Sequence, residues 1–145
     1  MFKHLLIATD GSPLSDDAAR NAVGLAKSLG ARVTAMTSSL PYRAFTAQYV
    51  MVSDTEDTYN WECRNRAEQY LAVIRKAAGA AGVACDEVHT FNEQAYATII
   101  ETAEQRGCDL ICMASHGRSG LTALVVGSVT MKVLTHSRIP VLVWR

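Results

Sequence analysis

Short apolar runs alternate along the chain with longer amphipathic segments. The first run, residues 5–8 (LLIA), is continuously apolar, which is typical of a strand in a parallel sheet whose two faces are both covered. Four more runs predict strands. The run at residues 83–91 contains more polar residues than the others, so it is the expected edge strand. The four are predicted at residues 33–37, 83–91, 110–114 and 140–144.

The amphipathic segments predict helices with recognisable ends. Ser12 is a good N-cap, Pro13 suits the first helical position, and apolar residues then recur at every third or fourth position. Gly30 can adopt the left-handed conformation that ends a helix. The same pattern predicts three more helices. One lies around residues 67–78 and ends at Gly79 or Gly82. Another runs from a cap at Asn92 to Gly107, and the last runs from residue 128 to about residue 137.

The periodic pattern fails between residues 38 and 60. This segment contains Pro41, scattered aromatic residues and the acidic residues Asp54, Glu56 and Asp57. A structureless connection of more than ~20 residues is uncommon in a compact domain and usually forms a lid, a binding loop or a disordered insert. We therefore expect a long, partly mobile connection here.

Strands and helices alternate in the order βαβαβαβαβ, which is typical of a parallel sheet between two helix layers with right-handed crossovers. The sequence therefore predicts a single doubly wound α/β domain over residues 1–145 with five strands, for which we assume the order 3-2-1-4-5. In such a sheet, ligands bind beyond the carboxyl ends of the strands, where the strand order reverses. The first and fourth strands meet at that point.

Charge and composition narrow the possible partners. Fourteen Lys and Arg balance fourteen Asp and Glu, so no overall field favours nucleic acid or an anionic membrane. Residues 110–145 nevertheless lack any Asp or Glu, so this part of the chain tolerates an anion. The apolar core of residues 5–8 is too short for a signal peptide or a membrane span, and a cytoplasmic location is expected.

The loop after the fourth strand has the composition of an anion site. It reads MASHGRSGLTALVVGSV over residues 113–129. Gly117 and Gly120 let backbone amides approach a phosphate, and Gly127 and Ser128 open a helix whose N-terminus attracts anions. Ser119 can add a hydroxyl donor. Sequence motifs of P-loop, Rossmann dinucleotide and ATP-pyrophosphatase sites are all missing, and on the motifs alone a structural turn stays an open alternative.

Two stretches of the chain resemble the universal stress protein family. HLLIATDGS resembles the family's opening strand with its Asp, and residues 113–145 resemble its C-terminal signature. Nucleotide-binding members carry G-x2-G-x9-G-[ST], which maps here onto Ala114, Gly117, Gly127 and Ser128, so alanine replaces the first glycine. The resemblance implies a flavodoxin-like fold. Ser38 is a second departure, because an aliphatic residue is expected where the adenine packs.

The resemblance also implies roles for individual residues. Asp10 would contact the ribose or a bound metal, the backbone near Ser38 would meet the adenine edge, and the glycine loop would hold the phosphates. The ligand implied is ATP or AMP, with Mg²⁺ carried by the triphosphate. The implied nucleotide-binding residues are Ala8, Thr9, Asp10, Ser38, Met113, Ala114, His116, Gly117, Arg118, Ser119, Gly120, Gly127, Ser128 and Val129.

The resulting hypothesis is an ATP-binding stress-response protein that senses or sequesters nucleotide. No catalytic residue is assigned, because His116 lacks a nucleophile or paired carboxylate in the motif and more simply orders the loop. Two alternatives stay open: a slow ATP hydrolase or phosphotransfer enzyme, and a dimeric interaction module with a vestigial site. The apolar last strand, Val141, Leu142, Val143 and Trp144, predicts a homodimer through this sheet edge.

Overall fold

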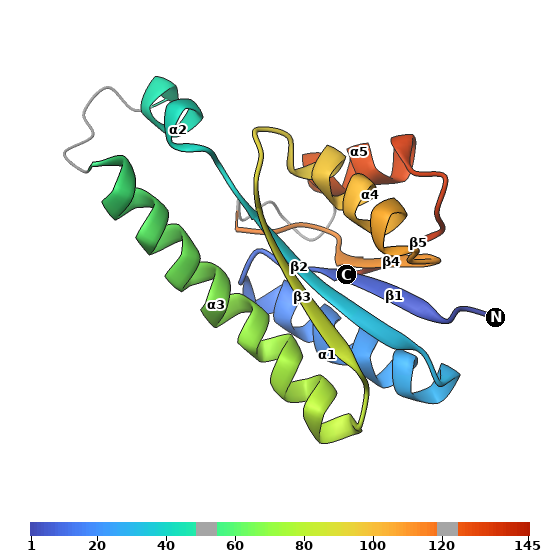
Figure 1. The fold of residues 1–145 in the computed structure, drawn as a ribbon. Coiled ribbons are helices and arrows are strands. Elements are labelled where there is room, and N and C mark those ends of the chain that lie inside the picture. The colour runs from blue at the N-terminus through green and yellow to red at the C-terminus, as the bar shows by residue number, and fades with distance from the viewer. Residues whose placement is uncertain (49–54, 119–124) are drawn as a thin grey trace.

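The computed structural model describes residues 1–48, 55–118 and 125–145. Five strands and five helices follow one another along this part of the chain (Figure 1). They are β1 (His4–Ala8), α1 (Pro13–Leu29), β2 (Arg32–Ser39), α2 (Tyr42–Gln48), α3 (Glu56–Ala81), β3 (Cys85–Phe91), α4 (Ala95–Arg106), β4 (Leu110–Ala114), α5 (Ser128–His136) and β5 (Val141–Trp144). No helix among these residues is long and apolar enough to cross a membrane.

The five strands form one sheet in the order β3-β2-β1-β4-β5, and every adjacent pair is parallel. The predicted fold class and strand order are therefore confirmed. In the centre of the sheet, Leu6 of β1 pairs with Thr34 of β2 and with Ile111 of β4. The order reverses between β1 and β4, which places the loops that follow these two strands side by side.

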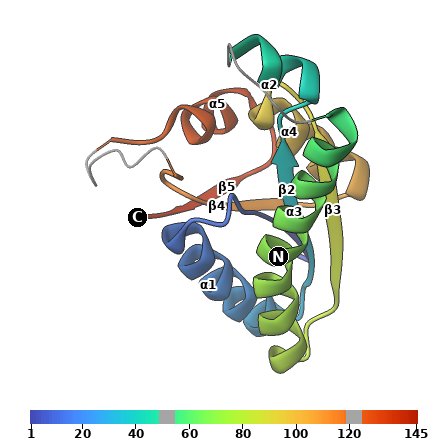
Figure 2. The same ribbon diagram turned by 90° about the vertical axis from the view of Figure 1, so that its left-hand side faces the viewer.

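Helices cover both faces of the sheet (Figures 1 and 2). Leu5 and Ile7 pack with residues of α1 and α3 on one face of the sheet. Leu6 packs with residues of α4 and α5 on the other face. Because successive side chains of a strand point to opposite faces, both halves of the run must be apolar. Leu5 and Leu6 are 0% exposed and Ile7 is 1% exposed, which explains the continuous apolar pattern.

The predicted ends of the first helix are confirmed. The Ser12 side chain accepts a hydrogen bond from the Ser15 amide at 3.2 Å, and Pro13 occupies the first turn of α1. Gly30 closes the helix with φ of 63°, and Gly82, rather than Gly79, closes α3 with φ of 70°.

The predicted cap at Asn92 is wrong. Asn92 Oδ1 accepts a hydrogen bond from the Gln94 amide at 2.8 Å, and α4 begins only at Ala95, with Gln94 at the cap position and no side-chain capping bond. An Asn side chain that bonds the backbone two residues ahead forms a turn of its own. The turn delays the start of the helix.

The long connection predicted over residues 38–60 is also wrong for most of its length. Strand β2 continues to Ser39, α2 follows at Tyr42, and α3 starts at Glu56, capped by Thr55, which accepts a hydrogen bond from the Thr58 amide at 3.2 Å. Residues 49–54 lie outside the described part. The first turns of α3 are largely exposed, so they show little of the apolar period from which a helix is recognised.

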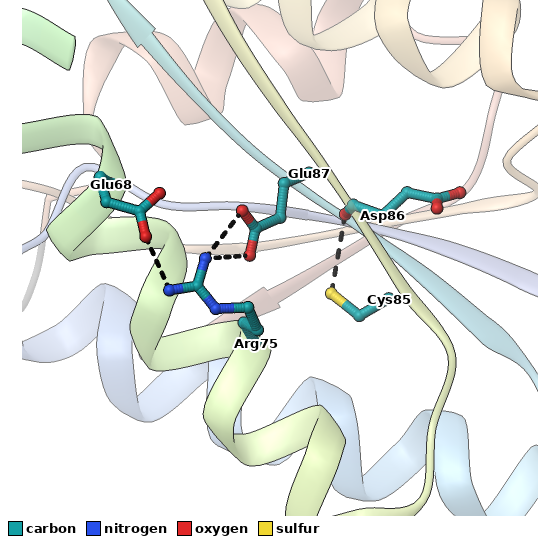
Figure 3. Close-up of polar contacts among 5 residues, drawn as sticks. All are labelled: Glu68, Arg75, Cys85, Asp86 and Glu87. Atoms are coloured by element: carbon teal, nitrogen blue, oxygen red, sulfur yellow. Dashed lines mark hydrogen bonds and ion pairs between the residues drawn. The ribbon is translucent and has the colours of Figure 1, made fainter.

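An exposed arginine connects α3 to the edge strand β3. Arg75 bonds Glu87 of β3 at 2.9 Å and Glu68, two turns earlier on α3, at 2.7 Å, and Figure 3 shows its guanidinium between the two carboxylates. Ion pairs in contact with water contribute little to stability. The contact therefore connects α3 with β3 but adds little to the stability of the fold.

We expect the protein to lose stability as the pH falls below about 6.5. His4 is 4% exposed, and burial together with the charge of Arg32 lowers the pKa of His4 from its usual 6.5, although Asp86 and Asp109 act in the opposite direction. Because the pKa of His4 is lower in the folded state than in the unfolded chain, the folded state binds fewer protons, and acidification favours unfolding.

Urea unfolding at pH 7.5 and pH 5.0 measures this effect. In His4→Gln, the free energy of unfolding should depend less on pH. Part of the dependence should remain, because burial also lowers the pKa of His89. If the free energies of unfolding at the two pH values differ as much in His4→Gln as in the wild-type protein, His4 does not contribute to the pH dependence.

Candidate functional site

A cavity of about 310 Å³ opens at the carboxyl ends of β1, β2 and β4, at the point where the strand order reverses. Its walls contain every residue of the predicted nucleotide site except Ser119 and Gly120, which lie outside the described part. The predicted residues that line it are Ala8, Thr9, Asp10, Ser38, Met113, Ala114, His116, Gly117, Arg118, Gly127, Ser128 and Val129.

The Asp10 carboxylate joins the loops that follow β1 and β4. Oδ1 accepts a hydrogen bond from the Ser12 amide and Oδ2 accepts one from the Arg118 amide, each at 3.0 Å. Partial burial raises the pKa of Asp10, but hydrogen bonds from Ser12, Ser15 and Arg118 outweigh it and hold the pKa below its ordinary value. Asp10 is therefore a carboxylate at neutral pH, with one acceptor bond on each oxygen.

Gly117 is required by this contact. A Cβ at position 117 would overlap Asp10 Oδ2 and lie 2.9 Å from Asp10 Cγ. Its φ is not in the left-handed region, so the constraint is space rather than backbone conformation. The two loops can approach each other because residue 117 has no side chain.

Ala114, which replaces the first glycine of the family motif, fits its place in the structure. It is the last residue of β4 and is 6% exposed. The described part contains no residue other than glycine with positive φ, so alanine at this position brings no backbone strain. Its carbonyl accepts a hydrogen bond from Thr130 Oγ1 at 2.9 Å, which connects β4 to α5.

The N-terminus of α5 opens toward the cavity. Gly127 occupies the cap position without a side-chain capping bond, and its amide donates to the Ser115 carbonyl at 2.7 Å. A Cβ at position 127 would lie 3.2 Å from His116 Cα, so the backbone is packed tightly here. The amides of the first turn, beginning at Ser128 and Val129, have no acceptor within the helix. They form a positively polarised end that suits an anion.

His116 and Arg118 have partners within the protein. His116 Nδ1 lies 3.1 Å from Ser115 Oγ, but Ser115 is 3% exposed and does not line the cavity, so the pair presents no nucleophile there. The Arg118 guanidinium lies over the Tyr70 ring of α3, 4.7 Å from its centre. Among the described residues, no three His, Cys, Asp or Glu side chains gather as a metal site.

Sequence reasoning missed the apolar wall of the cavity. Met36 of β2 and Ala95 and Ile99 of α4 line it, so part of the cavity wall is apolar. In sequence these residues look like ordinary core residues, so no motif marks them. Ser38 Oγ, by contrast, is buried without a hydrogen-bond partner in this structure, beside the apolar wall.

Gly117→Ala should weaken the site and the fold together. The added Cβ forces Asp10 away from the Arg118 amide, and we expect a loss of about 1–3 kcal/mol in the free energy of unfolding. Gly24→Ala is the matched control, because Gly24 lies within α1 with nothing within 4 Å of an added Cβ. Alanine there should stabilise by about 0.5–1 kcal/mol. Chemical denaturation of both variants measures the difference, and equal stability of the two would contradict the constraint.

Comparison with known proteins identifies the family. The family model described as "Universal stress protein family" matches residues 1–145. Universal stress protein MJ0531 of Methanocaldococcus jannaschii is 30% identical over 99% of this chain and 82% of its own length. Universal stress protein YxiE of Bacillus subtilis is 30% identical over the full length of both chains.

Solved structures show the same fold. A universal stress protein in complex with cAMP has a TM-score of 0.70 at 21% identity, covering 99% of this chain and 97% of its own. The universal stress protein of Archaeoglobus fulgidus in complex with dAMP has a TM-score of 0.67 at 19% identity, covering 100% and 98%. Because the family model matches residues 1–145 and both relatives are 30% identical over nearly the whole chain, the chain belongs to the universal stress protein family.

Proposed function

We propose that this protein binds ATP, carried with Mg²⁺, in the cavity at the ends of β1, β2 and β4, and that it senses or sequesters the nucleotide. The observation that carries the proposal is the division of one cavity of about 310 Å³ between an apolar wall and the polarised N-terminus of α5. A nucleotide has the same division between its base and its phosphates. The relatives solved with cAMP and dAMP bind adenine nucleotides, which supports the choice of base.

Each part of the cavity suits one part of the ligand. Met36 and Ile99 offer apolar contact to the base, and the unpartnered Ser38 hydroxyl can bond one of its polar edge atoms. The amides of Ser128 and Val129 suit the phosphates. Asp10 suits ribose hydroxyls or the Mg²⁺ of the nucleotide, because a carboxylate accepts hydrogen bonds and ligates hard cations.

The same residues explain why binding, rather than rapid turnover, is proposed. Both oxygens of Asp10 already accept backbone hydrogen bonds, and its lowered pKa makes it a weak general base. Asp10 is also the only carboxylate that lines the described cavity, so no second acid is in place to hold a metal-activated water. Slow hydrolysis or phosphotransfer stays the alternative, and it would depend on Asp10 and His116.

We also propose a homodimer through β5, in the cytoplasm. β5 is an edge strand with half-buried apolar side chains, and the adjoining helix α5 exposes Met131 by 49% and Leu134 by 44%. Exposed apolar groups beside an open sheet edge favour association around a two-fold axis.

Calorimetric titration with ATP and Mg²⁺ tests the nucleotide site. We expect saturable binding of one ATP per chain, and at least about tenfold weaker binding by Ser128→Glu, because a carboxylate at the start of α5 repels phosphate. Glutamate at a helix N-terminus does not disturb the helix itself. Thr135→Glu, on the exposed last turn of α5, is the control and should bind normally. No heat with the wild-type protein, or equal affinities for the two variants, would refute the proposal.

Sedimentation equilibrium tests the dimer. The wild-type protein should be a dimer at micromolar concentration, and Leu134→Glu should shift it toward monomer by placing a charge in the apolar interface. Trp61→Glu changes a residue that is 64% exposed on α3, away from β5, and should leave the dimer intact. A monomeric wild-type protein would exclude this association.

A further inference from the structure

A second cavity, of about 290 Å³, lies on the other side of the end of β2, against α2 and α3. Figure 2 shows α2 and the first turns of α3 near the arrowhead of β2. Phe45, Tyr59, Cys63, Arg66, Ala67 and Tyr70 line this cavity and none of them lines the first. Asp10, Thr37, Ser38 and Arg118 border both. The nucleotide proposal uses none of the six residues named first.

Aromatic rings held by the fold form one wall of the second cavity. The rings of Phe45 and Tyr59 stack with their centres 4.6 Å apart at 30°, and the Tyr59 hydroxyl donates to the Leu40 carbonyl at 2.8 Å. Tyr59 is 5% exposed. A ring fixed both by stacking and by its hydroxyl is preorganised, so little entropy is lost when a ligand packs against it.

Tyr70 forms the facing part of the wall because Gly11 leaves room for it. Gly11 has φ of 75°, and a Cβ there would lie 2.6 Å from Tyr70 Cζ and closer still to the ring edge. The ring therefore packs directly against the loop that follows β1. The Arg118 guanidinium also lies over the Tyr70 ring, 4.7 Å from its centre.

The charge of the second cavity is positive. Arg66 donates to the sulfur of Cys63 at 3.7 Å, and Arg118 stacks on Tyr70. Within the described part of the chain, neither guanidinium forms an ion pair. The single carboxylate in the lining, Asp10, already accepts two backbone hydrogen bonds. An entering anion would therefore meet two arginines that form no ion pair with any described carboxylate.

We propose that the second cavity binds a small planar aromatic anion, a ring that carries a carboxylate, sulfonate or phosphate group. Flat aromatic walls favour a planar ring, and guanidinium groups bind carboxylate, sulfonate and phosphate oxygens in pairs of hydrogen bonds. This is a site additional to the nucleotide cavity. Because Arg118 borders both cavities, it is the residue through which the two sites can be coupled, and any such coupling changes both affinities by the same factor.

Calorimetric titration with 2-naphthoate tests the site. We expect one binding event per chain, and weaker binding of the neutral analogue 2-naphthamide. Arg66→Gln should weaken 2-naphthoate binding about tenfold by removing a charged donor, and because Arg66 is exposed the variant should fold normally. Arg64→Gln, on the same helix with its guanidinium 6.0 Å from the centre of the Phe91 ring and outside both cavities, is the matched control.

Two further titrations separate this site from the nucleotide cavity. Ala67→Leu should fill the second cavity and reduce 2-naphthoate binding, with circular dichroism as the check on folding, while ATP binding by Arg66→Gln should stay unchanged. With ATP and Mg²⁺ at saturation, 2-naphthoate should still bind at one per chain. Complete one-for-one displacement by ATP, or equal affinity of Arg66→Gln and Arg64→Gln, would overturn the proposal, whether or not the protein binds ATP.

Discussion

The contact between the Asp10 carboxylate and the backbone of the loop after β4 determines the shape of the functional edge. Asp10 lies at the end of β1, yet its two oxygens accept amide hydrogen bonds from Ser12 and from Arg118, more than a hundred residues apart in sequence. The bond to Arg118 exists because residue 117 is a glycine. One half-buried carboxylate and the absence of a side chain at residue 117 thus hold together the two loops between which a nucleotide is proposed to bind.

The end of β2 divides the space around this contact. Met36 faces the cavity under α4 and α5, whereas Ser39 faces the cavity under α2 and α3. This division follows from the alternation of side chains along a strand. Asp10 and Arg118 border both spaces, and both are held in place, Asp10 by backbone hydrogen bonds and Arg118 by stacking on Tyr70. The edge behaves as one connected polar structure with two differently lined openings.

Much of the fold could be predicted from the sequence because its signals are local. Continuous apolar runs marked the strands, and Ser12, Pro13 and Gly30 marked the ends of α1. The errors fall where a local signal was weak or competed with another. The exposed first turns of α3 lack an apolar stripe, and Asn92 forms a turn with Gln94 in place of a cap at the start of α4. In the site, Met36 and Ile99 were missed because a residue that lines a cavity and a residue in a core have the same apolar character.

The sequence by itself determined the layer architecture, the strand order that the family resemblance also implies, and the positions of Asp10 and of the glycines and serines after β4. These depend on period, caps and motif spacing, all of which are properties of neighbouring residues. Only the tertiary structure decided why Gly117 is needed, that Ala114 is unstrained, and that Tyr59, Arg66 and Tyr70 enclose a second cavity. Those facts depend on distances between segments remote in sequence, which packing alone sets.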